Sequence, residues 1–175
     1  MSTTHPTPDH PQVISRPPRI MLSFLLLGAL LDFLWPLAQI PPLARYGIGG
    51  PLLLAGFWLI ARAMGGLRRA GTPVETCRPT LDLVTGGLYR FSRNPIYLAG
   101  FLLYLGIGNL AGSGWTLALF PVFFLVIRNG VVLREERYLE GRFGAPYRHY
   151  KTTTHRWLGH AARSCPANPC QERTQ

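Results

Sequence analysis

Apolar residues form four long stretches along the chain, separated by connections rich in polar residues, glycine or proline. These stretches cover residues 20–40, 48–64, 95–111 and 115–132. The first has the length of about 20 residues that a helix needs to cross the hydrocarbon core of a bilayer. The pattern therefore predicts an all-α integral membrane protein with about four transmembrane helices, paired as two antiparallel hairpins.

The connections predict how these helices begin and pair. Pro41 and Pro42 are expected to form the turn of a tight first hairpin, because consecutive prolines interrupt a helix. Residues 112–114 read Gly-Ser-Gly, and so short a connection forces the last two helices to run antiparallel. The third helix is expected to begin at Pro95, which suits the first helical position, with Asn94 as the capping residue.

One membrane domain, residues 20–158, is expected between two tails. Residues 1–19 contain five prolines and few apolar residues, which predicts disorder, and they do not read as a cleaved signal peptide. Residues 159–175 lack apolar periodicity and are also expected to be disordered. Within the domain, residues 134–151 form an amphipathic segment whose tyrosines and arginines suit the membrane interface.

Basic residues are distributed unevenly along the chain, which has 18 Lys and Arg, 8 Asp and Glu, and a formal net charge of +10. Two precede the first stretch, six lie in or beside the connector between the second and third, nine follow from Arg128 onward, and Arg45 lies elsewhere. Because cytoplasmic loops are enriched in Lys and Arg, this distribution predicts cytoplasmic termini and a cytoplasmic C-terminal segment. Nucleic acid is not an expected partner, since no nucleic-acid-binding motif accompanies the charge.

Two other features do not by themselves define a site. Cys77, Cys165 and Cys170 lack the paired spacing of a zinc site or a disulfide framework, so we expect reduced thiols and no metal. Asp32 lies inside the first apolar stretch, where an ionised carboxylate costs about 2.5–3.5 kcal/mol on insertion scales. We expect it to hydrogen-bond to a neighbouring helix; a catalytic role is the alternative.

Residues suited to chemistry are concentrated in two segments. Residues 83–97 read LVTGGLYRFSRNPIY, and Glu135 and Glu136 follow the last apolar stretch. Because the third and fourth helices form a hairpin, both segments are expected at one membrane face, where they would form a cytoplasmic pocket. The partly positive start of the third helix would receive a carboxylate or phosphate there. Adjacent glutamates among arginines are also typical of a solvated charge cluster.

Together the two segments resemble a known superfamily. The pattern G-x-Y-R-x-x-R-N-P-x-Y, followed by E-E-x-x-L-x-x-x-F-G-x-x-Y-x-x-Y, is similar to the isoprenylcysteine carboxyl methyltransferases and phospholipid methyltransferases, which are integral membrane enzymes. The similarity extends over residues 81–158. It implies that S-adenosylmethionine is the cofactor.

The resemblance also implies roles for individual residues. The cofactor pocket would be lined by Leu83, Val84, Tyr89, Asn94, Pro95, Ile96 and Tyr97. Glu135 would bind the amine of the cofactor. Apart from the resemblance, we expect Arg93 and Glu136 to be catalytic residues, with Arg93 orienting the acceptor or the cofactor carboxylate. Tyr89 and Tyr97 are equally typical of residues that anchor a protein at the membrane interface.

Three positions qualify this resemblance. Many members have His where this chain has Asn94, and Asn can neither act as a base nor carry charge. The carboxyl methyltransferases place Arg at the position of Val131 to hold the substrate carboxylate, so Arg128 or Arg134 would have to bind the substrate here. Residues 106–108 are similar to a Gly-x-Gly motif of the phospholipid branch, although such glycines in a membrane helix are more typical of a packing face.

We therefore expect a methyltransferase that acts on a lipophilic acceptor reached from the bilayer. Methyl transfer depends on alignment and needs no covalent enzyme intermediate, so a nucleophile motif is not required. Candidate acceptors are an isoprenylcysteine carboxylate, which Val131 makes less favoured, a phospholipid amine, and a small thiol or other lipophilic molecule. The alternative is a non-catalytic membrane scaffold or transporter subunit whose basic cytoplasmic face binds lipid. The sequence does not determine the oligomeric state.

Overall fold

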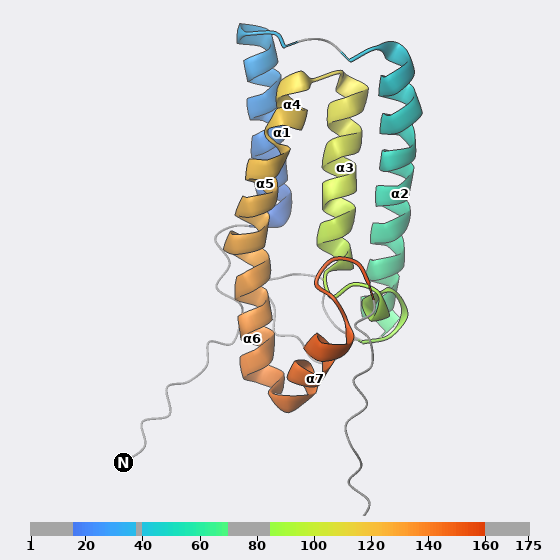
Figure 1. Cartoon of the computed structure of the whole chain (residues 1–175), viewed down its shortest axis with the longest axis vertical. Helices are drawn as coiled ribbons and strands as arrows, with labels where there is room; N and C mark the ends of the chain where they lie inside the picture. The colour runs from blue at the N-terminus through green and yellow to red at the C-terminus, as the bar shows by residue number, and fades with distance from the viewer. Residues whose placement is uncertain (1–15, 38–39, 70–84, 160–175) are drawn as a thin grey trace, which may run out of the picture.

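A computed structural model of the protein describes residues 16–37, 40–69 and 85–159, and in these residues all regular secondary structure is helical. The all-α prediction is therefore confirmed. The long helices are α1 (Pro17–Leu34), α2 (Pro42–Arg69) and α3 (Pro95–Ala111); α4 (Gly114–Ala118), α5 (Phe120–Ile127), α6 (Leu133–Phe143) and α7 (Ala145–Thr153) follow. The helices α1, α2, α3 and α5 run along the long axis of the molecule (Figure 1).

The first predicted hairpin differs from the structure. The helices α1 and α2 run in opposite directions but do not form a tight pair: α1 packs against α4 and α5, and α2 packs against α3 (Figure 1). Pro42 does not belong to the predicted turn, because it is the first residue of α2, and α1 already ends at Leu34. The first two helices therefore cover residues 17–34 and 42–69, where the apolar stretches cover residues 20–40 and 48–64.

Glycines explain which helices pack together. A Cβ on Gly56 of α2 would lie 2.8 Å from Leu103 of α3, and a Cβ on Gly106 of α3 would lie 2.9 Å from Leu53 of α2. On α1, a Cβ on Gly28 would overlap the Thr116 side chain of α4 and would lie 2.9 Å from the Thr116 Cα. Such close backbone approach allows extensive van der Waals contact between helices. Gly108 similarly contacts Thr116, so both glycines of the Gly-x-Gly pattern lie in packing contacts.

The third helix has the predicted bounds, residues 95–111. It begins with Pro95, and it ends at Ala111, because the next residue, Gly112, has a φ of +69°, which glycine adopts at low cost. The connection through Ser113 then reverses the chain direction, as expected (Figure 1). The predicted cap is not formed: Asn94 occupies the N-cap position, but its side chain makes no capping hydrogen bond.

The fourth predicted span is divided in the structure. Pro121 lacks the N–H that would bond to the carbonyl four residues earlier, and the helix breaks at Leu119 between α4 and α5. A π-helical segment, η2 (Arg128–Val132), then joins α5 to α6. Helical structure therefore continues well beyond the predicted end at residue 132, and α6 extends past the start of α3 (Figure 1).

The exposed surfaces of α1 and α2 are apolar. Both are long and apolar enough to cross a bilayer, whereas α3 is apolar but one residue shorter than α1. In the most apolar windows of α1 and α2, only 6% and 17% of the residues are buried. A core helix of a soluble protein would be mostly buried, so these faces are suited to contact with lipid.

Asp32 lies near the end of α1 rather than in the middle of a span, because the helix ends at Leu34. Its carboxylate accepts hydrogen bonds from the Ser113 hydroxyl and, at 3.4 Å, from the Trp115 amide. The Ser113 hydroxyl in turn accepts a hydrogen bond from the Thr116 amide at 3.0 Å. Asp32 therefore connects α1 to the turn between α3 and α4, as the structural interpretation predicted.

Candidate active site

The end of the bundle where α1 and α3 begin and α2 ends is here called the basic end (Figure 1). It also holds the short helix η1 (Gly87–Arg90), α6, α7 and residues 154–159. Tyr89, Tyr147 and Tyr150 form a buried cluster there, with Leu67, Leu139 and Phe143 packed against it. The Tyr150 hydroxyl donates to the Tyr89 carbonyl at 2.5 Å, which holds α7 against η1.

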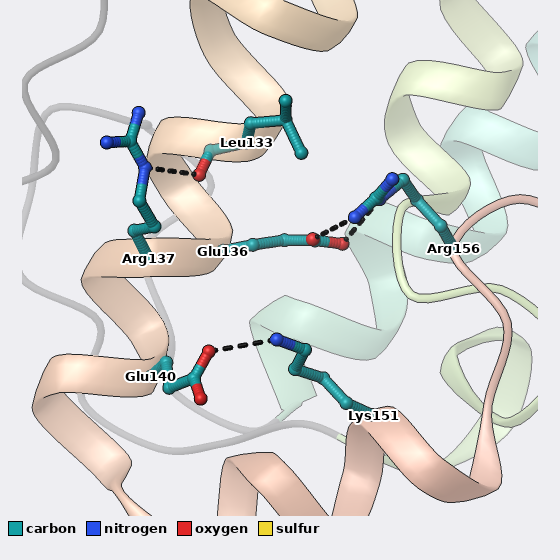
Figure 2. Close-up of a pocket in the computed structure, with 6 residues that line it drawn as sticks. All are labelled: Leu133, Glu136, Arg137, Glu140, Lys151 and Arg156. Atoms are coloured by element: carbon teal, nitrogen blue, oxygen red, sulfur yellow. Dashed lines mark hydrogen bonds and ion pairs between the residues drawn. The ribbon is translucent and has the colours of Figure 1, made fainter.

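Glu136 on α6 is the centre of a buried polar network at this end. Its carboxylate accepts two hydrogen bonds from Arg156, from Nε to Oε1 at 3.0 Å and from Nη2 to Oε2 at 2.8 Å. Figure 2 shows the Glu136 side chain extending from α6 toward this guanidinium. Burial opposes ionisation, but the hydrogen bonds from Arg156 and the nearby arginine charges lower the pKa of Glu136 below its usual value.

A second arginine shares the same carboxylate. Nη1 of Arg93 lies 3.5 Å from Oε1 of Glu136, and the Arg93 side chain is only 9% exposed. Among the described residues, Nε and Nη1 of this guanidinium have no hydrogen-bond partner. Buried guanidinium donors without partners are costly. Arg93 is therefore well suited to bind an anionic group.

Asn94 also belongs to the Glu136 network. Its Nδ2 donates to Oε1 of Glu136 and to the carbonyl of Arg156, both at 3.4 Å, and its own N–H donates to the Ser92 hydroxyl at 3.1 Å. These contacts explain why the side chain does not cap α3. The first amides of α3 therefore receive no capping hydrogen bond from Asn94. The N-terminal end of a helix attracts anions, so these amides are suited to an anionic group.

Glu135 occupies a different environment from Glu136. Its Oε2 accepts a hydrogen bond from the Tyr97 hydroxyl at 2.6 Å, and it is partly buried. Burial raises the pKa of Glu135; the Tyr97 hydrogen bond lowers it, and the charge of Glu136 raises it further. The Tyr89 pKa is raised by burial and by the charge of Glu135. The two adjacent glutamates therefore have opposite pKa shifts, and they are more than a solvated charge cluster.

Residues 155–159, here called the strap, run beside the start of α3. The Arg93 amide donates to the His155 carbonyl and the Gly159 amide donates to the Phe91 carbonyl, both at 3.0 Å. The Trp157 ring packs against Phe101 and Phe124, with centroid distances of 5.4 and 5.3 Å. The strap therefore has both backbone and side-chain anchors.

Arg156 was not predicted from the sequence, although it makes the strongest contacts to Glu136. The only sequence signal for it is indirect, because a buried glutamate needs a cationic partner and Arg156 lies within the stretch that resembles the methyltransferases. Tyr147 and Tyr150 belong to the second motif but were expected to be interfacial residues. The structure buries both instead.

The remaining predicted site residues are divided between the site and its surroundings. Pro95 is buried and Ile96 is half-buried at the start of α3. Arg128 donates to its neighbour Asn129 at 3.2 Å, and Arg134 lies on an exposed part of α6. Leu83 and Val84 lie outside the described residues, as do the three cysteines. The described residues contain no cluster of His, Cys, Asp and Glu suited to a metal ion.

An open depression of about 280 Å³ lies between α6 and the segment from α7 to the strap. It is lined by Leu133, Glu136, Arg137, Glu140, Lys151 and Arg156. In Figure 2, Lys151 points to Glu140 and Arg137 turns back to the Leu133 carbonyl. The Lys151–Glu140 pair, at 2.9 Å, is about one-third exposed on each side. It is thus a solvated ion pair beside a buried one.

The exposed apolar helices and the buried polar site at one end are typical of a membrane protein with a binding site near the bilayer surface. The chain belongs to the phospholipid methyltransferase family, whose sequence profile matches residues 44–146, more than half of the chain. The resemblance is thereby confirmed, and family membership indicates a membrane methyltransferase. An uncharacterised protein of Haemophilus influenzae is 41% identical over 63 residues, 36% of this chain and 90% of that protein. No solved structure matches the chain.

Proposed function

We propose that the protein transfers a methyl group from S-adenosylmethionine to a lipophilic acceptor at the basic end of the bundle. The observation that carries this proposal is the buried Arg93 guanidinium. Its Nε and Nη1 have no hydrogen-bond partner among the described residues, although Nη1 lies in an ion pair with Glu136 at 3.5 Å. Glu135 lies at the same end, because its Oε2 accepts a hydrogen bond from the Tyr97 hydroxyl in the first turn of α3, which directly follows Arg93 and Asn94. An anion site and a cation site are therefore available together.

The chemistry of these residues fits the amino-acid portion of S-adenosylmethionine. Arg93 would hold its carboxylate, with help from the start of α3, and Glu135 would hold its amine. Tyr89 and Tyr97 would supply aromatic surface, which is also attractive to a sulfonium. Leu83 and Val84 remain proposed lining residues by family resemblance.

When bound, the cofactor supplies an electrophilic methyl group, which the lone pair of an acceptor takes as the carbon–sulfur bond breaks. The protein's contribution is alignment and exclusion of water. Glu136 holds Arg93 and Arg156 through its carboxylate, and its oxygens already have several donors. We therefore assign Glu136 a positioning role instead of direct contact with the reacting groups. Arg93 binds the cofactor carboxylate and thereby orients the cofactor.

The surroundings of Val131 bear on the acceptor. Val131 is fully buried in the apolar core of the bundle, so the position at which carboxyl methyltransferases place Arg offers no cation here. Arg128 is engaged with Asn129. These observations favour a phospholipid-amine-like acceptor over an isoprenylcysteine carboxylate. Approach from the bilayer, past the exposed apolar helices, would suit such an acceptor.

We further propose that the protein spans the membrane four times with the basic end in the cytoplasm. Arg19, Arg68, Arg69 and Arg90 lie on elements that begin or end there. Arg45 lies at the opposite end, where it donates to the Leu110 carbonyl at 2.7 Å. The concentration of arginines at the basic end agrees with the enrichment of Lys and Arg in cytoplasmic loops.

Calorimetric titration of detergent-purified protein with S-adenosylmethionine tests the proposal. We expect saturable binding, which Glu135→Gln weakens by about tenfold or more because it removes one partner of a desolvated charge pair. Glu140→Gln, the same substitution in the exposed ion pair on α6, should leave the affinity unchanged. An absence of binding to the parent protein would instead favour the non-catalytic scaffold or transporter subunit.

A further inference from the structure

The two arginines at Glu136 are not equivalent. Arg156 uses Nε and Nη2 to contact both carboxylate oxygens, at 3.0 and 2.8 Å, whereas Arg93 approaches one oxygen at 3.5 Å. Asn94 approaches that same oxygen at 3.4 Å. The carboxylate is thus largely occupied by Arg156. Arg93 is left with a loose ion pair through Nη1, and neither Nη1 nor Nε has a hydrogen-bond partner among the described residues.

We propose that Arg156 is a positioning residue, which occupies the Glu136 carboxylate and so keeps the Arg93 guanidinium available for the carboxylate of the bound cofactor. The inference rests on the proposed function and extends it to Arg156, which follows residue 146, where the match to the family's sequence profile ends.

Competition for one carboxylate provides the mechanism. A planar guanidinium and a carboxylate prefer two parallel hydrogen bonds, and Glu136 can form only one such pairing at a time. The two hydrogen bonds from Arg156 to Glu136 are here called the fork. Without the fork, rotation of Arg93 to contact both carboxylate oxygens would be favourable, because the buried donors of Arg93 would then have hydrogen-bond partners. A guanidinium held in that way would offer fewer donors to a ligand carboxylate. The affinity for that group would fall even though Arg93 is still present.

Charge supports the same assignment. Glu136, Arg93 and Arg156 carry one negative and two positive charges in a network where Glu136 and Arg93 are more than nine-tenths buried. Arg93 is the more buried of the two arginines, so its charge is poorly solvated and an anionic ligand group stabilises it. Loss of Arg156 would leave a neutral Glu136–Arg93 pair with no such excess.

The strap remains anchored without the Arg156 side chain. The Arg156 carbonyl accepts hydrogen bonds from Ser92 at 3.3 Å and Asn94 at 3.4 Å. Trp157 packs between aromatic rings, and the His155 carbonyl accepts from the Arg93 amide. Replacement of Arg156 should therefore change the pairing at Glu136 more than the path of the chain. Trp157→Leu offers the converse change, a loosened strap with the fork retained.

The test compares two ligands on each variant by calorimetry: S-adenosylmethionine and its decarboxylated analogue, which keeps the sulfonium and the amine. The ratio of the two affinities reports only on recognition of the carboxylate. Arg93→Met should reduce this ratio by about tenfold or more, as expected for loss of hydrogen bonds between charged groups. Arg156→Met should reduce it by a similar factor. Arg156→Lys should give an intermediate ratio, because lysine keeps the charge but lacks the fork.

Two controls separate positioning from a structural role. Lys151→Met breaks the exposed ion pair on the same side of α6 and should leave the ratio unchanged. Trp157→Leu should lower thermal stability while keeping the ratio. In the double variant Arg93→Met with Arg156→Met, the ratio should fall no further than in Arg93→Met alone, because Arg156 acts through Arg93.

Each outcome decides the matter. If Arg156→Met weakens both ligands equally, or leaves the ratio unchanged while Arg93→Met reduces it, the positioning role is wrong and the proposed function still stands. If Arg156→Met does not fold, Arg156→Lys provides the same comparison. An affinity ratio in Arg156→Lys equal to that of the parent protein would then show that the two hydrogen bonds from Arg156 are not needed, and the positioning role would be wrong. If the parent protein binds neither ligand, the proposed function fails together with this inference.

Discussion

Glu136→Gln removes the one negative charge that pairs with two arginines, and its cost can be worked out from burial. The side chains of Glu136, Arg93 and Arg156 are 6%, 9% and 27% exposed. Breaking a buried ion pair by removing one partner costs about 3–5 kcal/mol. Glutamine keeps some hydrogen bonds and Arg156 is partly solvated, so we expect the lower limit, about 3 kcal/mol. For a chain of this size, that corresponds to a fall in Tm of about 6–12 °C.

Glu140→Gln is a matched control, because it is the same substitution one turn further along α6. Glu140 pairs with Lys151 at 2.9 Å, and the two side chains are 34% and 35% exposed. Exposed pairs contribute about 0–1 kcal/mol, so this variant should lose at most about 4 °C. Thermal unfolding of the purified proteins in detergent, followed by tryptophan fluorescence, measures both. Equal shifts for the two variants would refute the reasoning that burial distinguishes them.

Three further predictions concern pH, the opposite end of the bundle, and topology. Burial raises the pKa of Glu135, and only the ionised carboxylate attracts the amine of the cofactor, so the affinity for S-adenosylmethionine should increase as pH rises through that pKa. Glu135→Gln should remove this pH dependence in a calorimetric series; an unchanged slope in the variant would contradict the assignment. Asp32→Asn should keep cofactor affinity and lower Tm by a few degrees at most, since it weakens only the contacts to the Ser113 turn; lost binding at parental Tm would show a role in the site. In a background in which Cys77, Cys165 and Cys170 are replaced by Ser, an impermeant thiol reagent added to intact cells should label Ala111→Cys and not Thr152→Cys, and the reverse pattern would invert the proposed topology.

The sequence determined those features that depend on local backbone chemistry and composition. The bounds of α3 were predictable because proline suits a first helical position and glycine readily adopts the left-handed conformation that ends the helix at Gly112. The all-helical class followed from four apolar stretches, and the family followed from two motifs. The short connection at residues 112–114 also predicted that residues 94–97 and Glu135 lie at the same end of the last hairpin, where the Tyr97 hydroxyl contacts Glu135.

Only the tertiary structure decided which side chains and helices meet beyond the chain's local reach. Apolar composition does not specify partners, so the packing of α2 on α3 and of α1 on α4 depended on glycine faces that fit particular neighbours. Asn94 could cap α3 locally through its Oδ1, but its Nδ2 donates to buried Glu136 and the side chain makes no capping hydrogen bond. Arg156 becomes part of the site because the strap returns beside α3, 20 residues after Glu136. A buried carboxylate requires a cationic partner, but which of the many arginines provides it depends on the folded path of the chain.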